Sequence, residues 1–128
     1  MTMREIKFRA WDKFSNEMIN VKTIDFGPRG VECAVDYSNI NGDLKGEWVL
    51  EQYTGLKDKN GVEIYEGDIV CQQMRFDETN GVIFWQEEKS RFAINLDGFI
   101  TTITKPQEDS YEVVGNIHEN PELLEGTK

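Results

Sequence analysis

The sequence predicts a mainly β protein. Its 128 residues contain many short segments that are rich in aromatic and β-branched residues, with apolar and polar side chains partly alternating. Turn sequences that contain Gly or Asn separate these segments. We expect a single domain, residues 1–128, in which a small N-terminal sheet (residues 1–50) packs on a C-terminal, SH3-like, partly open β-barrel (residues 51–120).

The first half is expected to form four strands. In the first of them Ile6, Phe8 and Ala10 point to one face and the intervening basic residues to the other, as in a half-buried strand. Sequences typical of turns separate these segments. The expected strands are Ile6–Trp11, Met18–Phe26, Val31–Tyr37 and Glu47–Leu50.

The second half is expected to form five strands and a short C-terminal helical turn. Asp97-Gly98 is a strong signal for a tight turn, because Gly adopts positive φ without steric cost, and Asn60-Gly61 and Asn80-Gly81 belong to the same class. Pro121 and the acidic residue after it indicate the start of the helical turn. The expected strands are Ile69–Met74, Gly81–Gln86, Arg91–Leu96, Phe99–Thr104 and Tyr111–Ile117.

The formal net charge of −10 is unevenly distributed. Residues 1–64 carry 9 Lys and Arg against 11 Asp and Glu, whereas residues 65–128 carry 5 against 13. An acidic protein repels phosphate backbones and anionic lipid, which disfavours direct binding to nucleic acid or to a membrane. A basic partner, or a host protein that itself binds DNA, remains compatible with this charge.

The sequence indicates a cytoplasmic protein. The residues after Met1 lack the apolar run of a signal peptide, and no stretch reaches the roughly 18 apolar residues of a membrane span. Cys33 and Cys71 lie 38 positions apart in expected strands. We expect a reduced, buried pair, and a disulfide stays open as the alternative.

Aromatic residues are expected to supply much of the core. The second half contains a set of five aromatic residues, named below, and we expect most of them to pack in the core. The alternative is that some of them are stacking platforms for single-stranded nucleic acid. Phe84 and Trp85 are adjacent and must point to opposite faces of a strand, so one of them lies outside the core. Trp85 is therefore a candidate interface residue, together with Asn116 and Asn120. The aromatic set is Phe76, Phe84, Trp85, Phe92 and Phe99.

Three ordered motifs resemble those of the YopX-like proteins, small proteins encoded mainly by phages and prophages. They are Arg4–Asp12, Leu50–Val70 and Val113–Leu124, and they frame nearly the whole chain. One departure is His118, where relatives commonly carry Tyr. The resemblance implies a self-associating phage or prophage protein in the cytoplasm of a bacterial host, and it implies no biochemical activity.

The second motif contains the candidate site residues. Its polar side chains could line a binding surface, or they could serve turn chemistry alone, with one turn at residues 58–61 and a second at Glu66-Gly67-Asp68. The predicted polar surface consists of Gln52, Tyr53, Thr54, Asp58, Asn60 and Asp68.

Catalytic patterns are weak. Asp58, Glu66 and Asp68 could gather around Mg²⁺, but a chain with 24 acidic residues offers many accidental triplets. His118 is the single imidazole, no Gly-x-Ser-x-Gly elbow is present, and neither Cys has a partner at zinc-ligand spacing. We therefore predict no catalytic, metal or cofactor-binding residue and no cofactor.

The function predicted from the sequence is that of a non-enzymatic phage or prophage accessory protein. It would act through protein–protein contacts, by forming a homo-oligomer and by contacting a host protein. Two alternatives stay open. One is an acidic mimic of nucleic acid that occupies a host DNA-binding protein through the carboxylates of residues 65–128. The other is a metal-dependent enzyme that acts on nucleic acid.

Overall fold

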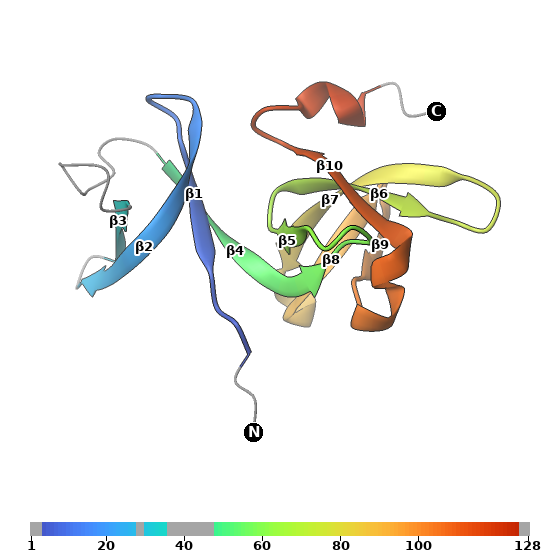
Figure 1. Cartoon of the computed structure of the whole chain (residues 1–128), viewed down its shortest axis with the longest axis horizontal. Coiled ribbons are helices and arrows are strands. Elements are labelled where there is room, and N and C mark those ends of the chain that lie inside the picture. The colour runs from blue at the N-terminus through green and yellow to red at the C-terminus, as the bar shows by residue number, and fades with distance from the viewer. Residues whose placement is uncertain (1–3, 28–29, 36–47, 126–128) are drawn as a thin grey trace. The chain divides into compact units, whose positions relative to one another are not determined.

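The computed structural model describes residues 4–27, 30–35 and 48–125, and these residues form a mainly β protein (Figure 1). The prediction of the fold class is confirmed. The chain divides into two compact units, residues 1–52 and residues 53–128, which we call the first and the second unit. Among the described residues, no helix is long and apolar enough to cross a membrane.

The first unit contains antiparallel strands around a central strand, β1. Its strands are β1 (Phe8–Asp12), β2 (Glu17–Gly27), β3 (Gly30–Val35) and the beginning of β4 (Trp48–Lys57). β1 pairs with β2 on one side and with β4 on the other, and β3 pairs with β2. β4 runs on to Lys57, beyond the predicted end at Leu50, and its last part pairs with β5 in the second unit. The buried side chains of this sheet include Ala10 and Trp11 of β1.

The second unit is built on a five-stranded antiparallel sheet with the order β10-β6-β7-β8-β9, which curls into a half-barrel (Figure 1). The short tail segment η3 confirms the predicted helical turn and has 3₁₀ geometry. The strands are β5 (Glu63–Tyr65), β6 (Asp68–Gln73), β7 (Glu78–Gln86), β8 (Arg91–Leu96), β9 (Phe99–Thr102) and β10 (Tyr111–Asn116). The 3₁₀ segments are η1 (Glu87–Lys89), η2 (Lys105–Ser110) and η3 (Pro121–Leu124).

Two of the predicted Gly turns are confirmed and one is wrong. Gly61 and Gly98 have φ values of +83° and +98°, as their turns require. Asn80-Gly81 instead lies inside β7. A Cβ on Gly81 would lie 2.7 Å from Cγ1 of Ile94 and 2.8 Å from the backbone oxygen of Asn95. The glycine therefore serves close packing of β7 against β8, because any side chain there would enter the neighbouring strand.

The core of the second unit is mainly aliphatic, with Tyr111 as an aromatic member, which corrects the expectation that most of the aromatic set packs in the core. Phe76, Phe99 and Trp85 are 90%, 63% and 44% exposed, and Phe92 is half-buried against the core. Phe76 lies in the β6–β7 turn and Phe99 at the start of β9. The buried core residues are Ile64, Val70, Ile83, Ile94, Leu96, Ile103 and Tyr111.

Cys71 in β6 is a free, half-buried thiol. Burial raises the pKa of Cys71 above its ordinary value of 9.0, and the neighbouring carboxylate of Glu78 raises it further. The neutral thiol therefore predominates at physiological pH. The side chain of Cys33, the other cysteine of the expected pair, lies outside the described residues.

Candidate ligand-binding site

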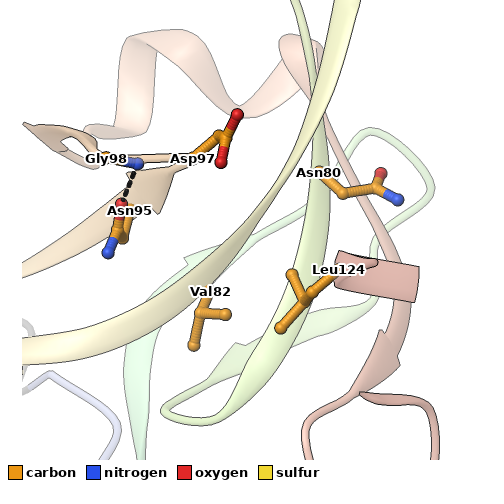
Figure 2. A pocket seen from close by; sticks show the side chains of 6 residues that line it. All are labelled: Asn80, Val82, Asn95, Asp97, Gly98 and Leu124. Atoms are coloured by element: carbon orange, nitrogen blue, oxygen red, sulfur yellow. Dashed lines mark hydrogen bonds between the residues drawn. The ribbon is translucent and has the colours of Figure 1, made fainter. Parts of the chain in front are cut away.

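The second unit has a pocket of about 230 Å³ on the face of the half-barrel sheet opposite the core. Ile83 and Ile94 point into the core, so their neighbours Val82 and Asn95 point to the other face, which we call the outer face. Figure 2 shows the lining residues around a common space. They are Asn80 and Val82 of β7, Asn95 of β8, Asp97 and Gly98 of the β8–β9 turn, and Leu124 of η3.

The floor and one wall of the pocket follow from the pairing of β7, β8 and β9. Val82 and Asn95 are register partners, which places their side chains next to each other. The two-residue loop Asp97-Gly98 has positive φ at both positions, 52° and 98°, as in a type I′ hairpin turn. The Gly98 N–H donates a hydrogen bond to Oδ1 of Asn95 at 2.8 Å and fixes the orientation of that amide (Figure 2).

The opposite wall comes from the C-terminal segment η3. Nδ2 of Asn80 donates a hydrogen bond to the backbone oxygen of Leu123 at 3.0 Å, across 43 positions of the sequence. This bond holds η3 on β7, and the next residue, Leu124, reaches toward Val82 (Figure 2). The seating of η3 on β7 therefore supplies one side of the pocket.

The polar atoms of the pocket are two acceptors and one donor. Oδ1 of Asn95 accepts the bond from Gly98, so Nδ2 of Asn95 remains as a donor for a ligand. Nδ2 of Asn80 donates to Leu123, so Oδ1 of Asn80 remains as an acceptor. Asp97 adds an exposed carboxylate at the rim. No Lys, Arg or His lines this pocket. The arrangement suits a small group that donates hydrogen bonds and carries an apolar portion.

The predicted polar surface lies largely inside the structure. Tyr53, Asp58 and Asp68 are buried, whereas Asn60 is exposed. Oδ1 of Asp58 accepts hydrogen bonds from the N–H groups of Asn60 (2.8 Å) and Val62 (2.9 Å). Oδ2 of Asp58 accepts a third, from the Val113 N–H at 2.9 Å. Asp58 thus organises the predicted turn at residues 58–61 and ties it to β10.

Two other polar residues of this set also bond to the backbone. Oδ2 of Asp68 accepts a hydrogen bond from the Tyr65 N–H at 2.7 Å and closes the predicted turn at residues 66–68. The hydroxyl of Thr54 donates to the backbone oxygen of Ile64 at 2.8 Å. The remaining residue, Gln52, is half-buried at the end of the first unit. A ligand-binding role for the six residues stays a prediction.

Metal binding gains no support from these positions. Among residues 4–27, 30–35 and 48–125, no three His, Cys, Asp or Glu side chains are placed to share a metal ion. Asp58 and Asp68, two members of the triplet considered from the sequence, direct carboxylate oxygens at backbone N–H groups. Their chemistry here is that of turn formation.

The three predicted interface residues have different surroundings. Trp85 is 44% exposed and packs edge-on against Phe92, with ring centroids 5.0 Å apart. Asn116 is buried, and its Oδ1 accepts hydrogen bonds from the N–H groups of His118 and Glu119. Oδ1 of Asn120 in turn accepts one from the Asn116 N–H at 3.2 Å. The two asparagines shape the turn after β10, and an interface role for all three stays a prediction.

The pocket residues were not among the site residues predicted from the sequence. Asp97 and Gly98 were identified as a turn, and Asn80 was wrongly assigned to one. The bond between Asn80 and Leu123, which brings Leu124 to the pocket, spans 43 positions of the sequence, and no local sequence pattern indicates it. A single sequence therefore offered no means of finding this site.

Comparison with known proteins identifies the family. The sequence model described as YopX protein matches residues 7–125. The chain belongs to the YopX family. This confirms the resemblance drawn from the three motifs, and the family description states no biochemical role. No curated protein matches the chain.

Two solved structures share the YopX-family fold of this chain. The crystal structure of protein EF1440 from Enterococcus faecalis has a TM-score of 0.62 and 32% sequence identity, and the match covers 96% of this chain and 100% of that one. The crystal structure of protein yopX from Bacillus subtilis has a TM-score of 0.67 and 19% identity, with the same coverage. At 19% identity the second likeness concerns the fold alone.

Proposed function

We propose that this YopX-family protein is a non-enzymatic accessory protein of a phage or prophage that acts through protein–protein contacts, including contacts with a second copy of itself. The observation that carries the proposal is the edge strand β9. It lies at the end of the half-barrel sheet, after β8. The sequence of β9 is Phe-Ile-Thr-Thr, without a charge, a proline or a glycine.

An apolar edge of this kind favours association. Edge strands of proteins that stay monomeric are usually protected by charged residues, proline or a bulge. β9 has none of these, and Phe99 and Ile100 are 63% and 41% exposed. Burying two such side chains against a partner contributes on the order of 1.5–3 kcal/mol each when burial is complete.

The backbone of β9 also offers hydrogen-bonding groups to a partner strand. Leu96 and Phe99 flank the two-residue turn, so Phe99 and Thr101 exchange hydrogen bonds with β8. The N–H and C=O groups of Ile100 and Thr102 consequently point away from β8. Among the described strands, β9 pairs with β8 alone. An added strand could take up these groups, and a second β9 in antiparallel orientation is self-complementary around a twofold axis.

The carboxylates that were considered as metal ligands have structural roles, which supports the non-enzymatic part of the proposal. Asp58 and Asp68 accept hydrogen bonds from backbone N–H groups, which explains their presence in the motif without a reaction. The net charge of −10 disfavours a phosphate-bearing partner, because like charges repel. Binding to a protein partner requires no reaction centre and is not opposed by this repulsion.

The test measures the molecular mass in solution over a wide range of concentration, by size-exclusion chromatography with light scattering. We expect the wild-type protein to form an oligomer and the Ile100→Lys variant to be monomeric, because a lysine on the edge opposes strand addition. The control is Val62→Lys, which adds the same charge at another exposed apolar residue of the second unit, 47% exposed. A wild-type protein that is monomeric throughout and retains no protein from host lysate would contradict the proposal.

A further inference from the structure

We propose that the pocket between β7, β8 and η3 binds an arginine side chain of a partner protein. The inference rests on the proposed function, because it assumes a protein partner, and adds the chemistry by which that partner is recognised. Three features of the pocket support the inference: its charge, its unpaired hydrogen-bonding atoms, and its apolar walls together with its small volume.

The charge of the pocket selects a cation. Asp97 is the single charged residue in its lining, and no basic side chain there neutralises it. The surrounding half of the chain is strongly acidic, with 5 Lys and Arg against 13 Asp and Glu in residues 65–128. An anionic ligand would meet a repulsive potential, whereas a cation is attracted.

The free polar atoms suit a group with several donors. Oδ1 of Asn80 and the carboxylate of Asp97 accept hydrogen bonds, and they come from different elements, β7 and the β8–β9 turn. A guanidinium group has N–H donors pointing in several directions of one plane and no acceptor, so it can bond to both. The one free donor, Nδ2 of Asn95, can bond to a backbone oxygen of the segment that carries the arginine.

The walls and the volume suit one side chain. Val82 and Leu124 are half-buried and present apolar surface, against which the methylene stem of an arginine can pack. The volume of about 230 Å³ is below the roughly 300–1,000 Å³ of sites for drug-sized ligands. A single side chain therefore fits the site better than a cofactor does.

The experiment titrates the isotope-labelled full-length protein with N-acetyl-arginine methylamide and follows its amide NMR signals. We expect saturable shifts of the Gly98 backbone amide and of the side-chain amides of Asn80 and Asn95. The Asp97→Asn variant should bind about two- to fivefold more weakly, the effect of losing one partly exposed charge pair. Asn retains the positive φ of 52° at this position without strain, so the turn is preserved.

Two controls separate the pocket from general charge attraction. Asp109→Asn removes the same charge from an exposed residue of η2 that does not line the pocket, and it should leave the affinity unchanged. N-acetyl-citrulline methylamide, which is neutral and has the same shape, should bind several-fold more weakly. Equal weakening by the two variants, shifts scattered over other acidic positions, or equal binding of citrulline would each overturn the proposal. Equal binding of the corresponding lysine compound would overturn the arginine assignment.

The two proposals fail separately. Ile100→Lys should lose self-association, and because Ile100 is the register partner of Asn95, the added charge should weaken but not abolish the shifts at Gly98. A monomeric wild-type protein that retains no host protein but shows the Gly98 shifts would contradict the proposed function alone. A self-associating protein with no shifts up to saturating arginine compound would contradict the pocket assignment alone.

Discussion

Oδ2 of Asp58 accepts a hydrogen bond from the backbone N–H of Val113, 2.9 Å away and 55 positions later in the sequence. The neighbouring Lys59 N–H donates to the backbone oxygen of Tyr111 at 2.9 Å. The loop between β4 and β5 is thereby joined to β10. Two of the family motifs, Leu50–Val70 and Val113–Leu124, meet at this carboxylate, which gives the polar residue a structural reason to be there.

Replacing Asp58 should destabilise the second unit. Asp58→Ala removes the buried acceptor of three backbone N–H groups, and the loss of a hydrogen bond to a charged group costs about 1.5–3 kcal/mol. Asp58→Asn should cost less, since its amide retains one acceptor oxygen. Urea unfolding followed by circular dichroism measures the free energy of unfolding. The control, Asp77→Ala in an exposed turn, should change it by less than about 0.5 kcal/mol, and an equal effect of the two alanine variants would contradict this role.

Gly81→Ala should destabilise the pairing of β7 with β8. The added Cβ would lie 2.8 Å from the backbone oxygen of Asn95, an atom that cannot move away as a flexible side chain can. Overpacking of this kind costs about 1–3 kcal/mol. Thermal and urea unfolding measure the loss, with Glu78→Ala at an exposed position of the same strand as the control. A fully stable Gly81→Ala protein would show that the strands are less closely packed.

The first unit contains an ion pair whose removal should be costly. Nε of Arg9 lies 2.9 Å from Oε1 of Glu51, and the two side chains are 13% and 5% exposed. Glu51→Gln removes the negative charge of this largely buried ion pair, so we expect a loss of about 3 kcal/mol. The exposed pair Lys7–Glu5, at 3.1 Å, is the matched control, and Glu5→Gln should cost less than about 1 kcal/mol. Similar losses in urea unfolding of the two variants would contradict the expectation.

Stability should fall at alkaline pH. Burial raises the pKa of Tyr111 above its ordinary value of 10.0, and burial likewise raises the pKa of Cys71 above 9.0. Because the folded protein holds these protons more tightly than the unfolded chain, their contribution is complete below the unfolded pKa and is lost as the pH rises through the folded pKa. We therefore expect the free energy of unfolding to decline above pH 9.0 and more steeply above pH 10.0.

The variant Tyr111→Phe tests the origin of this decline. It loses the hydrogen bond that the hydroxyl accepts from the Thr104 N–H at 3.2 Å, so it should be less stable at neutral pH. Its stability should also depend less on pH above 10.0, because the titrating hydroxyl is gone. Urea unfolding of both proteins at neutral and alkaline pH provides the comparison. Parallel pH profiles would show that another group controls the alkaline decline.

The sequence could predict those parts of the fold that local chemistry decides. Alternating side chains placed β8 at Arg91–Leu96, as observed. Asp97-Gly98 and Asn60-Gly61 form the predicted turns, since few residues adopt their positive φ. The missed strand β5 has three residues, too few for alternation to mark it.

The candidate site could not be predicted because it depends on pairing over long distances. Asn80-Gly81 has the composition of a turn, yet it lies within β7, where close packing against β8 requires a glycine. Most of the aromatic set was expected in the core, yet Phe76, Trp85 and Phe99 are 90%, 44% and 63% exposed. Neither outcome is encoded within a few residues of the position concerned.

By itself, the sequence determined the mainly β class, the positions of the Gly turns that adopt positive φ, and membership of the YopX family through three ordered motifs. Only the tertiary structure decided which carboxylates are used by the backbone, which aromatic residues face water, and that Asn80, Asn95 and Leu124 enclose a pocket. The physical reason is that backbone preferences act over a few residues, whereas the pocket depends on strand pairing, such as that of Val82 with Asn95, and on the seating of η3 by a contact across 43 positions.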